Sequence, residues 1–408
     1  MERVTFIHAA DLHIDSPFIG LSHIHEDLYH YVRTSTFKAF DRMIDYAIKQ
    51  RVDFILLVGD LFDHEKQSLH AQVHLRTRFE QLLTYDIHVY ISYGNHDFLQ
   101  GNVHDVKYPE NVHIFSSEEV TSKTFIKNGH PLVEISGFSY ESRAVLTNKT
   151  SEYVITNDDI PYHIAMLHGS IQTNTEHDRY APFQLTDLLK QPYDYWALGH
   201  IHKRDILHKD VPVIYPGNTQ GRHRKETGVK GCYHVTLEGD HCETQFIETS
   251  VLTFETLRVK LKEISSIYDI EEQLVHELTT TFDSEQYELI HLQFETAEVE
   301  HFKWEDDGTI NDLIDIINDN FTKKNVYVFI VSHDLEIVKP PTINFAQEDF
   351  LRTLNNELSQ LNVEDSIEPL FSHKEARRHL LELSTDEEER IKQYAKQLLI
   401  SELSGDRS

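Results

Sequence analysis

Cysteine and long hydrophobic runs are scarce in this sequence, and their scarcity excludes several classes of protein. Only Cys232 and Cys242 occur among 408 residues, too few for the disulfide framework of a small secreted domain. No apolar run reaches the roughly 18 residues of a transmembrane helix. The first residues, MERVTFIHAAD, enter an apolar strand without the features of a signal peptide. We therefore expect a cytoplasmic protein that is not attached to a membrane.

The two cysteines flank the stretch LEGDH (237–241). If Gly239 and Asp240 form the two-residue turn of a hairpin, Cys242 faces Leu237 and not Cys232. We therefore expect two free thiols in a reducing compartment.

Positive charge is also scarce, because 38 Lys and Arg residues stand against 68 Asp and Glu residues, a net charge of −30. Residues 251–408 alone carry 15 basic and 34 acidic residues. An acidic surface repels the phosphate backbone of nucleic acids. Any contact with nucleic acid must therefore be local, and the best candidates are HKRDILHK (202–209) and GRHRK (221–225).

The length of the chain predicts two or three domains. In the first part, residues 1–250, short apolar strands alternate with amphipathic stretches such as the helix expected at 33–50, whose apolar face holds Phe37, Phe40, Ile44 and Ile48. The expected strands are residues 3–11, 52–60, 87–95, 163–169 and 193–200. This alternation predicts an α/β fold in which helices cover a sheet.

The rest of the chain has a different pattern. Residues 251–340 are expected to form a small α+β domain that ends at Pro340 and Pro341. Its expected strands are 251–259, 287–296 and 325–332, and its expected helices are 269–279 and 310–321. Residues 341–408 are expected to be helical, with a capping box formed by Asn344 and Gln347.

All five expected strands of the first part end in residues that can bind a metal ion. These residues are Asp11 and His13, Asp60, Asn95, His168, and His200 with His202. Side chains two positions apart on an extended chain point the same way, so His200 and His202 can converge. Ligands in α/β folds bind at the carboxyl ends of strands. Alone, Asp60 is an ordinary turn residue and His168 an ordinary core histidine, but the whole set predicts a metal site.

The ligand types also predict the kind of site. Mixed aspartate, histidine and asparagine ligands favour manganese, iron or zinc over magnesium or calcium. Seven ligands are too many for one ion but suit two ions about 3.5–4 Å apart, the spacing of two-metal phosphoryl chemistry.

The motifs D-x-H, GD-x-x-D, GNHD, a lone His before Gly, and GH-x-H, in this order, resemble those of the calcineurin-like metallophosphoesterases. Within that superfamily, three stretches are similar to the SbcD-type DNA repair exonucleases, and most closely to their YhaO-like branch. They are HAADLHIDSPF (8–18), GDLFD (59–63) and YPGNTQGRHRKETGVKG (215–231). The motifs cover residues 1–235.

The resemblance implies a metallophosphoesterase β-sandwich flanked by helices, with the α+β part as a capping domain. It also implies two divalent ions, which we expect to be Mn²⁺. The first would be held by Asp11, His13, Asp60 and His202, and the second by Asp60, Asn95, His168 and His200. Asp60 would therefore bridge the two ions.

A mechanism follows from these parts. A water held between two cations loses its proton near neutral pH and attacks phosphorus in line. We expect His96 to protonate the leaving alkoxide and Asp63 to orient the His96 ring. The eukaryotic and archaeal repair nucleases carry histidine where this chain and bacterial SbcD carry Asp63. A tight turn at Gly217 and Asn218 is expected to bring backbone near the site.

The expected function is that of an exonuclease acting on DNA ends, single-stranded or duplex, in repair. The resemblance implies an SbcC-like coiled-coil ATPase as partner, docked on residues 374–408, and leaves room for a homodimer. The apolar stripe for that docking, within 384–403, could equally pack on its own domain. One rival function is a phosphodiesterase or phosphatase on a small nucleotide or phosphoprotein, which the charge of −30 favours. Another is a non-catalytic scaffold for the ATPase, although all expected ligands are present.

Overall fold

The computed structural model describes residues 2–337 with short gaps, and isolated residues beyond 337. The gaps are 19–20, 22–23, 64–66, 102–105, 173–179, 262–265, 283–284, 297–300, 302–303 and 305–306. Beyond residue 337, the structure describes only 352–354, 356–358, 360–363, 366, 388, 391–392 and 395. The expected capping box at Asn344 and most of the expected docking segment 374–408 lie outside the described residues.

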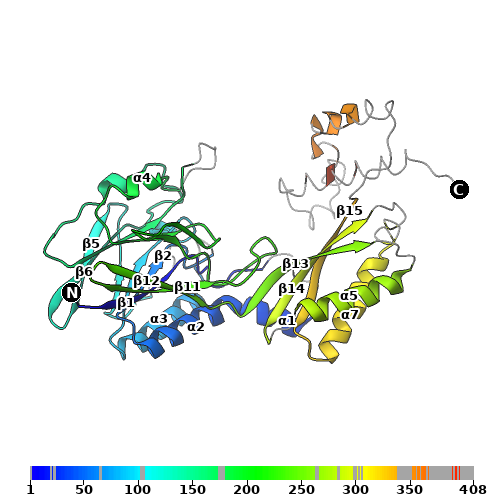
Figure 1. Cartoon of the computed structure of the whole chain (residues 1–408), viewed down its shortest axis with the longest axis horizontal. Helices are drawn as coiled ribbons and strands as arrows, with labels where there is room; N and C mark the ends of the chain where they lie inside the picture. Colours follow the sequence, from blue (N-terminus) through cyan, green and yellow to red (C-terminus); the bar gives the residue numbers. More distant parts are fainter. Residues whose placement is uncertain are drawn as a thin grey trace. The chain divides into compact units, whose positions relative to one another are not determined.

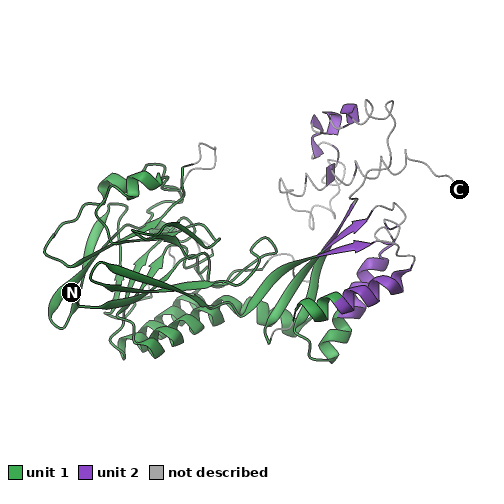
Figure 2. Ribbon diagram, viewed as in Figure 1, with its two compact units in different colours: residues 1–257, 277–292, 318–332 green, residues 258–276, 293–317, 333–408 purple. Residues whose placement is uncertain are grey.

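The chain divides into two compact units, which Figure 2 shows in different colours. Unit 1 comprises residues 1–257, 277–292 and 318–332, and unit 2 comprises 258–276, 293–317 and 333–408. Several segments thus cross between the units, and the domain borders expected at 250 and 340 stay predictions.

Unit 1 contains two six-stranded sheets (Figure 1). The first has the order β12-β11-β1-β2-β3-β4, in which β1 to β4 are parallel. Its strands are β1 (Val4–Ala9), β2 (Phe54–Val58), β3 (His88–Ser92), β4 (Val112–Ile114), β11 (Gly231–Glu238) and β12 (His241–Glu248). Every residue of β2 is buried, as expected for a parallel strand covered on both faces.

The second sheet has the order β5-β6-β7-β8-β10-β9, with parallel pairs from β6 to β10. Its strands are β5 (Thr121–Lys127), β6 (His130–Gly137), β7 (Tyr162–His168), β8 (Tyr195–Gly199), β9 (Asp205–His208) and β10 (Val213–Tyr215). Both β7 and β8 are wholly buried.

The two sheets share an apolar core. Phe6, Leu56 and Tyr90 from the first sheet pack with Ile164 and Met166 from the second. The structure therefore confirms the expected β-sandwich of an α/β protein.

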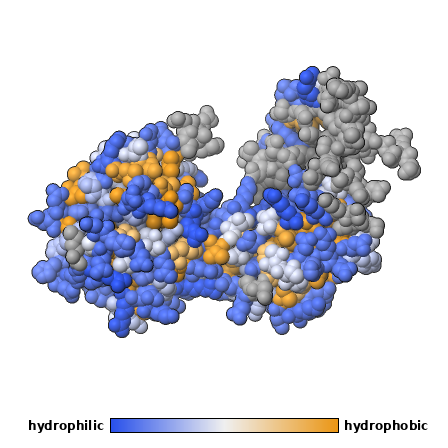
Figure 3. Space-filling model, viewed as in Figure 1, coloured by the Kyte–Doolittle hydropathy of each residue, from blue (hydrophilic) through white to orange (hydrophobic). Residues whose placement is uncertain are grey.

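Helices cover the outer face of the first sheet. Helix α1 (Glu26–Arg33) precedes α2 (Ser35–Gln50), and α3 (Leu69–Leu83) follows β2. Phe37, Phe40 and Ile44 of α2 are buried in this layer and Ile48 packs against it, which confirms the expected apolar face. On the second sheet, the short helix α4 (Leu185–Leu188) contributes Leu188 to a separate core. The surface visible in Figure 3 is mostly hydrophilic, with apolar residues gathered beside α4.

The α+β elements expected after residue 250 are present. They are β13 (Leu252–Leu261), α5 (Ile267–Thr281), β14 (Tyr287–Thr296), α7 (Thr309–Lys323) and β15 (Val328–Ile337), and the strands form a sheet of order β13-β14-β15. Among the described residues, no helix combines the length and the apolar character needed to cross a membrane.

The hairpin between β11 and β12 confirms the expected register. Glu238 pairs with His241 and Leu237 pairs with Cys242, so Gly239 and Asp240 form the two-residue turn. Both cysteines are free thiols.

Candidate metal centre

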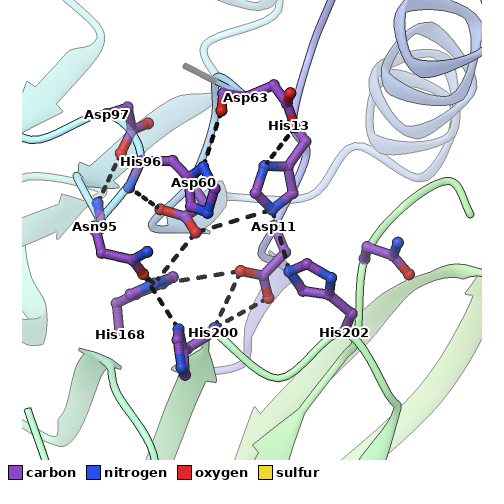
Figure 4. A network of polar contacts seen from close by, with 12 residues as sticks. Asp11, His13, Asp60, Asp63, Asn95, His96, Asp97, His168, His200 and His202 are labelled. Carbon is purple, nitrogen blue, oxygen red and sulfur yellow. Dashed lines mark hydrogen bonds and ion pairs between the residues drawn. The ribbon is translucent and has the colours of Figure 1, made fainter. Parts of the chain in front are cut away.

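All seven expected ligands converge at one edge of the sandwich, where the strands that carry or precede them end (Figure 4). Asp11 and His13 follow β1, Asp60 follows β2 and Asn95 follows β3 in the first sheet, while His168 ends β7 and His200 and His202 follow β8 in the second sheet. Ligands from both sheets therefore meet at the place where parallel strands end.

The ligand atoms form two overlapping groups. Atoms of Asp11, His13 and His202 lie within 4.8 Å of one another, and so do atoms of Asp11, Asp60 and His168. Oδ2 of Asp60 is 3.8 Å from Nε2 of His13 and 3.5 Å from Nε2 of His168. Asp11 is the member that the two groups share, while Asp60 stands between one imidazole of each expected set, as a bridging ligand would.

Asn95 joins the second group through its amide oxygen. Its Oδ1 lies 3.0 Å from Nε2 of His168 and 3.2 Å from Nδ1 of His200. The backbone N–H of His200 donates to both carboxylate oxygens of Asp11, at 3.1 and 3.0 Å, which links the two groups.

His13 and His200 are electrically neutral donors, whereas at His202 the Glu226 carboxylate outweighs burial and raises the pKa. Burial, together with Arg222 and neighbouring imidazoles, holds the pKa of His13 well below its usual value. Burial also lowers the pKa of His200 to about 3. Neutral imidazoles present a lone pair, which is the form that binds a metal ion.

The carboxylates respond differently to burial. Burial raises the pKa of Asp11, and the nearby Asp60 adds to the rise. Burial would raise the pKa of Asp60 too, but the imidazoles of His168 and His96 outweigh it and lower that pKa. Two buried carboxylates so close together are costly without positive charge between them.

The geometry of the donor set suits a divalent cation. Nε2 of His13 and Nε2 of His202 lie 3.1 Å apart. Nδ1 of His202 faces Oε1 of Glu226 at 2.6 Å and so carries that ring's proton, which leaves Nε2 with a lone pair. Two imidazole nitrogens that face each other across a buried gap suit a shared cation, as the two neighbouring carboxylates do.

The backbone at the site adopts left-handed conformations that side chains rarely take. The φ angles are 51° at Asp11, 42° at His13, 49° at Asp60 and 98° at His200. Gly59, which precedes Asp60, has φ of 76°, and a Cβ atom there would lie 2.1 Å from Nδ1 of His168. Strained backbone of this kind persists only where the surrounding structure holds it, and it clusters at functional sites.

His96 lies beside the two groups without belonging to either. Its backbone N–H donates to Oδ1 of Asp60 at 3.0 Å, and its ring meets the His13 ring edge-to-face, with centroids 5.0 Å apart. Nδ1 of His96 donates to the backbone carbonyl of Asp63 at 2.8 Å.

The contact with Asp63 agrees with the expected pairing and identifies the atom involved. The hydrogen bond from His96 runs to the Asp63 carbonyl. The carboxylate pairs with the Arg222 guanidinium and lies 3.4 Å from Nδ1 of His13. The guanidinium offers the carboxylate a charged partner.

The last residue of the GNHD motif, Asp97, was not expected to have a role. It is fully buried, and its carboxylate accepts the N–H groups of Leu61 and Gly94, each at 2.7 Å. Burial, with Asp60 nearby, raises the pKa of Asp97. Asp97 thus ties the loop that carries Asp60 to the loop that carries Asn95.

One further residue near His202, Glu226, was also missed. Glu226 accepts hydrogen bonds from His202, from Nδ2 of Asn218 at 2.8 Å and from the N–H of Arg222 at 2.7 Å. Burial opposes ionisation of Glu226, but His202 and Arg222 lower its pKa to about 2. The expected turn at Gly217 does lie near the site, since the N–H of Asn218 donates to the His202 carbonyl at 3.4 Å.

The basic segments expected to meet nucleic acid differ in exposure. Lys203, Arg204 and Lys225 are exposed, whereas Arg222 is only partly exposed and its guanidinium is engaged by Asp63 and Glu226. Arg222 therefore belongs to the surroundings of the metal centre.

Comparison with known proteins adds independent evidence. The profile of the calcineurin-like phosphoesterase family matches residues 4–204, a span that includes all seven expected ligands. The chain is 37% identical to the uncharacterized metallophosphoesterase YhaO of Bacillus subtilis (strain 168), over 98% of both chains. It is 21% identical to the DNA double-strand break repair protein Mre11 of Sulfolobus acidocaldarius, over 94% of this chain and 95% of that one. With the Mre11 protein of Methanocaldococcus jannaschii it shares 26% identity, over 60% of this chain and 65% of the other.

Proposed function

Because this chain belongs to the calcineurin-like phosphoesterase family, we propose that it is a two-metal phosphodiesterase that acts as an exonuclease on DNA ends in repair. The observation that carries the proposal is the position of Asp60 Oδ2, between His13 at 3.8 Å and His168 at 3.5 Å. The choice of DNA is supported by the relatives named as DNA double-strand break repair proteins.

The mixed nitrogen and oxygen ligands support Mn²⁺ as the metal. When bound, a pair of such ions acts as a Lewis acid toward the phosphate and lowers the pKa of water in the site. Asp11, His13, Asp60 and His202 would hold one ion, and Asp60, Asn95, His168 and His200 the other. The chain itself supplies fixed positions for these ligands, since Asp97 and the Asp11 carboxylate tie their loops together.

His96 is the group that delivers the proton to the leaving alkoxide. The Asp63 carbonyl can only accept, so Nδ1 of His96 carries a proton and the donating atom is Nε2. The imidazolium form therefore gives up its Nε2 proton as the bond to phosphorus breaks. The role of Asp63 in this step is played by its carbonyl.

The site that meets DNA is small, because the chain as a whole is acidic. Exposed Lys203, next to His202, is the basic residue best placed to contact a phosphate. The partners beyond DNA are an SbcC-like coiled-coil ATPase docked on residues 374–408 and a second copy of the chain. The free cysteines agree with a cytoplasmic location.

A small nucleotide or a phosphoprotein is the rival substrate, and the net charge of −30 favours it. The deciding experiment incubates the purified protein with Mn²⁺ and end-labelled single-stranded DNA, duplex DNA, a cyclic dinucleotide or a phosphopeptide, with Asp60→Ala as the inactive control. Stepwise shortening of labelled DNA supports the proposal. Turnover of only the cyclic dinucleotide or the phosphopeptide would contradict it, and no turnover of any substrate would favour the scaffold.

A further inference from the structure

The carboxylate of Glu226 is held from several sides in the loop between β10 and β11. Its side chain is 6% exposed. Oε1 faces Nδ1 of His202 at 2.6 Å, and Oε2 accepts from Asn218 Nδ2 at 2.8 Å and from the Arg222 N–H at 2.7 Å. With both oxygens engaged, the carboxylate cannot rotate away from His202.

This contact decides how His202 can act as a ligand. A carboxylate accepts but does not donate, so Nδ1 of His202 carries the proton and Nε2 is left to bind. That Nε2 points toward Nε2 of His13, 3.1 Å away. A carboxylate on the remote nitrogen of a metal-binding histidine fixes its tautomer and orientation and makes it a stronger ligand.

Arg222 extends the same network to the other imidazole of the first group. Its Nη2 lies 3.7 Å from Glu226 Oε1, and its Nη1 pairs with the Asp63 carboxylate. That carboxylate is 3.4 Å from Nδ1 of His13. A chain of charged side chains thus passes behind both His202 and His13. It consists of Glu226, Arg222 and Asp63.

His168, one of the two histidines expected to hold the second ion, is oriented in another way. Nδ1 of His168 donates to the backbone carbonyl of Val58 at 3.1 Å. A backbone carbonyl carries no net charge and comes with the sheet itself. His202 and His168 therefore differ in the group that accepts from Nδ1, a carboxylate for His202 and a backbone carbonyl for His168.

We propose that Glu226 is a positioning residue for one of the two metal ions, the ion held by His13 and His202. This inference rests on the two-ion centre of the proposed function but not on the choice of DNA as substrate. Replacing Glu226 removes the anion behind His202 and leaves the support of His168 in place. The loss of metal affinity should therefore affect only one of the two ions.

The test is a Mn²⁺ titration of the full chain, with bound metal counted by equilibrium dialysis. Glu226→Gln is expected to weaken one of two binding steps by about 10- to 100-fold, the usual effect of losing such a partner, and to leave the other step unchanged. His202→Ala should weaken the same step, and the double variant should be no weaker at that step than His202→Ala. Glu134→Gln is the matched control, because Glu134 is also buried and hydrogen-bonded, to Thr156, away from the centre.

The outcomes separate this inference from the proposed function. If the wild type binds fewer than two ions, the two-ion centre itself is wrong. If the wild type binds two ions and Glu226→Gln binds both with wild-type affinity, or loses both equally, Glu226 has no selective positioning role. Far-UV circular dichroism in chelator checks the fold of each variant. Should Glu226→Gln unfold, Asn218→Ala takes its place and is expected to weaken the same step by a smaller factor, and an unchanged step there would overturn the proposal.

Discussion

In β1 and β2, the middle of the strand and its carboxyl end are buried equally, yet they hold opposite kinds of side chain. In β1 and the turn after it, Phe6 and Asp11 are both 0% exposed, and along β2 Leu56 is 0% and Asp60 1% exposed. The apolar side chains in the middle stabilise the fold because folding removes them from water. Buried carboxylates cost free energy unless they are paired or bind a cation. Stability and chemistry are therefore supplied by different segments of the same strands.

The backbone differs between the two regions in the same way. The strand middles form regular ladders, as in the pairing of Leu56 with His8 and with Tyr90. The ends turn through left-handed conformations at Asp11, His13 and Asp60. A regular middle is what allows the ends to hold strained residues in fixed positions.

Removing the bridging carboxylate should produce the largest effect at the polar edge. Asp60→Ala is expected to release both ions and to abolish phosphodiesterase activity, because Asp60 faces an imidazole from each ligand set. Metal analysis and an activity assay measure both results. The control is Asp53→Ala at the opposite end of the same strand, where Asp53 accepts from the N–H of Thr5 at 2.8 Å. Two ions still bound per chain in Asp60→Ala would disprove the bridging role.

His96 separates metal binding from chemistry within that edge. His96→Gln should keep both ions and the affinity for substrate while lowering the cleavage rate by about 10²- to 10⁴-fold, the scale of a lost general acid. The loss should shrink for a p-nitrophenyl phosphodiester, whose leaving group needs no proton. Equal losses on both substrates, or loss of metal, would remove His96 from this role.

Asp63→Asn is the matched comparison for His96→Gln. The variant keeps the carbonyl that orients His96, so the proton-transfer pattern should be retained. It changes the charge beside Arg222 and His13, and its effect should therefore appear in metal affinity. A selective loss of rate on the unactivated substrate would show that the carboxylate orients His96 after all.

The ligands could be predicted from sequence because each stands at a sharp local change from a buried strand to a polar turn. Glu226 shows no such change, and its contact with His202 depends on the path of β9 and β10, which sequence pattern does not specify. Asp97 belongs to the GNHD motif, and its bond to the N–H of Gly94, three residues back, is a local contact that the motif could have suggested. Strand β5 was not expected, because its exposed positions weaken the apolar pattern.

A cavity in the apolar middle tests whether stability can be lost without loss of the site. Leu56→Ala is expected to lower the free energy of unfolding by about 2–5 kcal/mol, as for other buried leucines. At temperatures where the variant remains folded, it should still bind two ions. Urea unfolding and metal analysis provide the measurements, with exposed Leu83→Ala on α3 as the control. Loss of metal by the folded variant would show that the two regions are not independent.

The smallest expected effect concerns His8, the one ionisable side chain of β1, which is fully buried. Leu198 O can only accept, so Nε2 of His8 donates to it at 3.0 Å, and Nδ1 accepts from the hydroxyl of Tyr195 at 2.9 Å. Both bonds require the neutral ring, and burial lowers the pKa of His8 to about 3.

The unfolded chain has an ordinary histidine pKa of about 6.5, so it takes up a proton first as the pH falls. The stability that His8 contributes is therefore complete above about pH 6.5 and declines between that pH and the folded pKa, by up to about 1.4 kcal/mol per pH unit. His8→Gln can form the same two bonds without titrating, so its unfolding free energy should fall less steeply between pH 6 and 4 than that of the wild type. Urea unfolding in chelator measures the difference without metal binding, and His130→Gln at an exposed position should keep the wild-type slope. Equal slopes of unfolding free energy against pH for the wild type and His8→Gln would mean that the middle of the strand accommodates a charged ring. The strand middle and the metal-binding edge would then differ in backbone geometry alone.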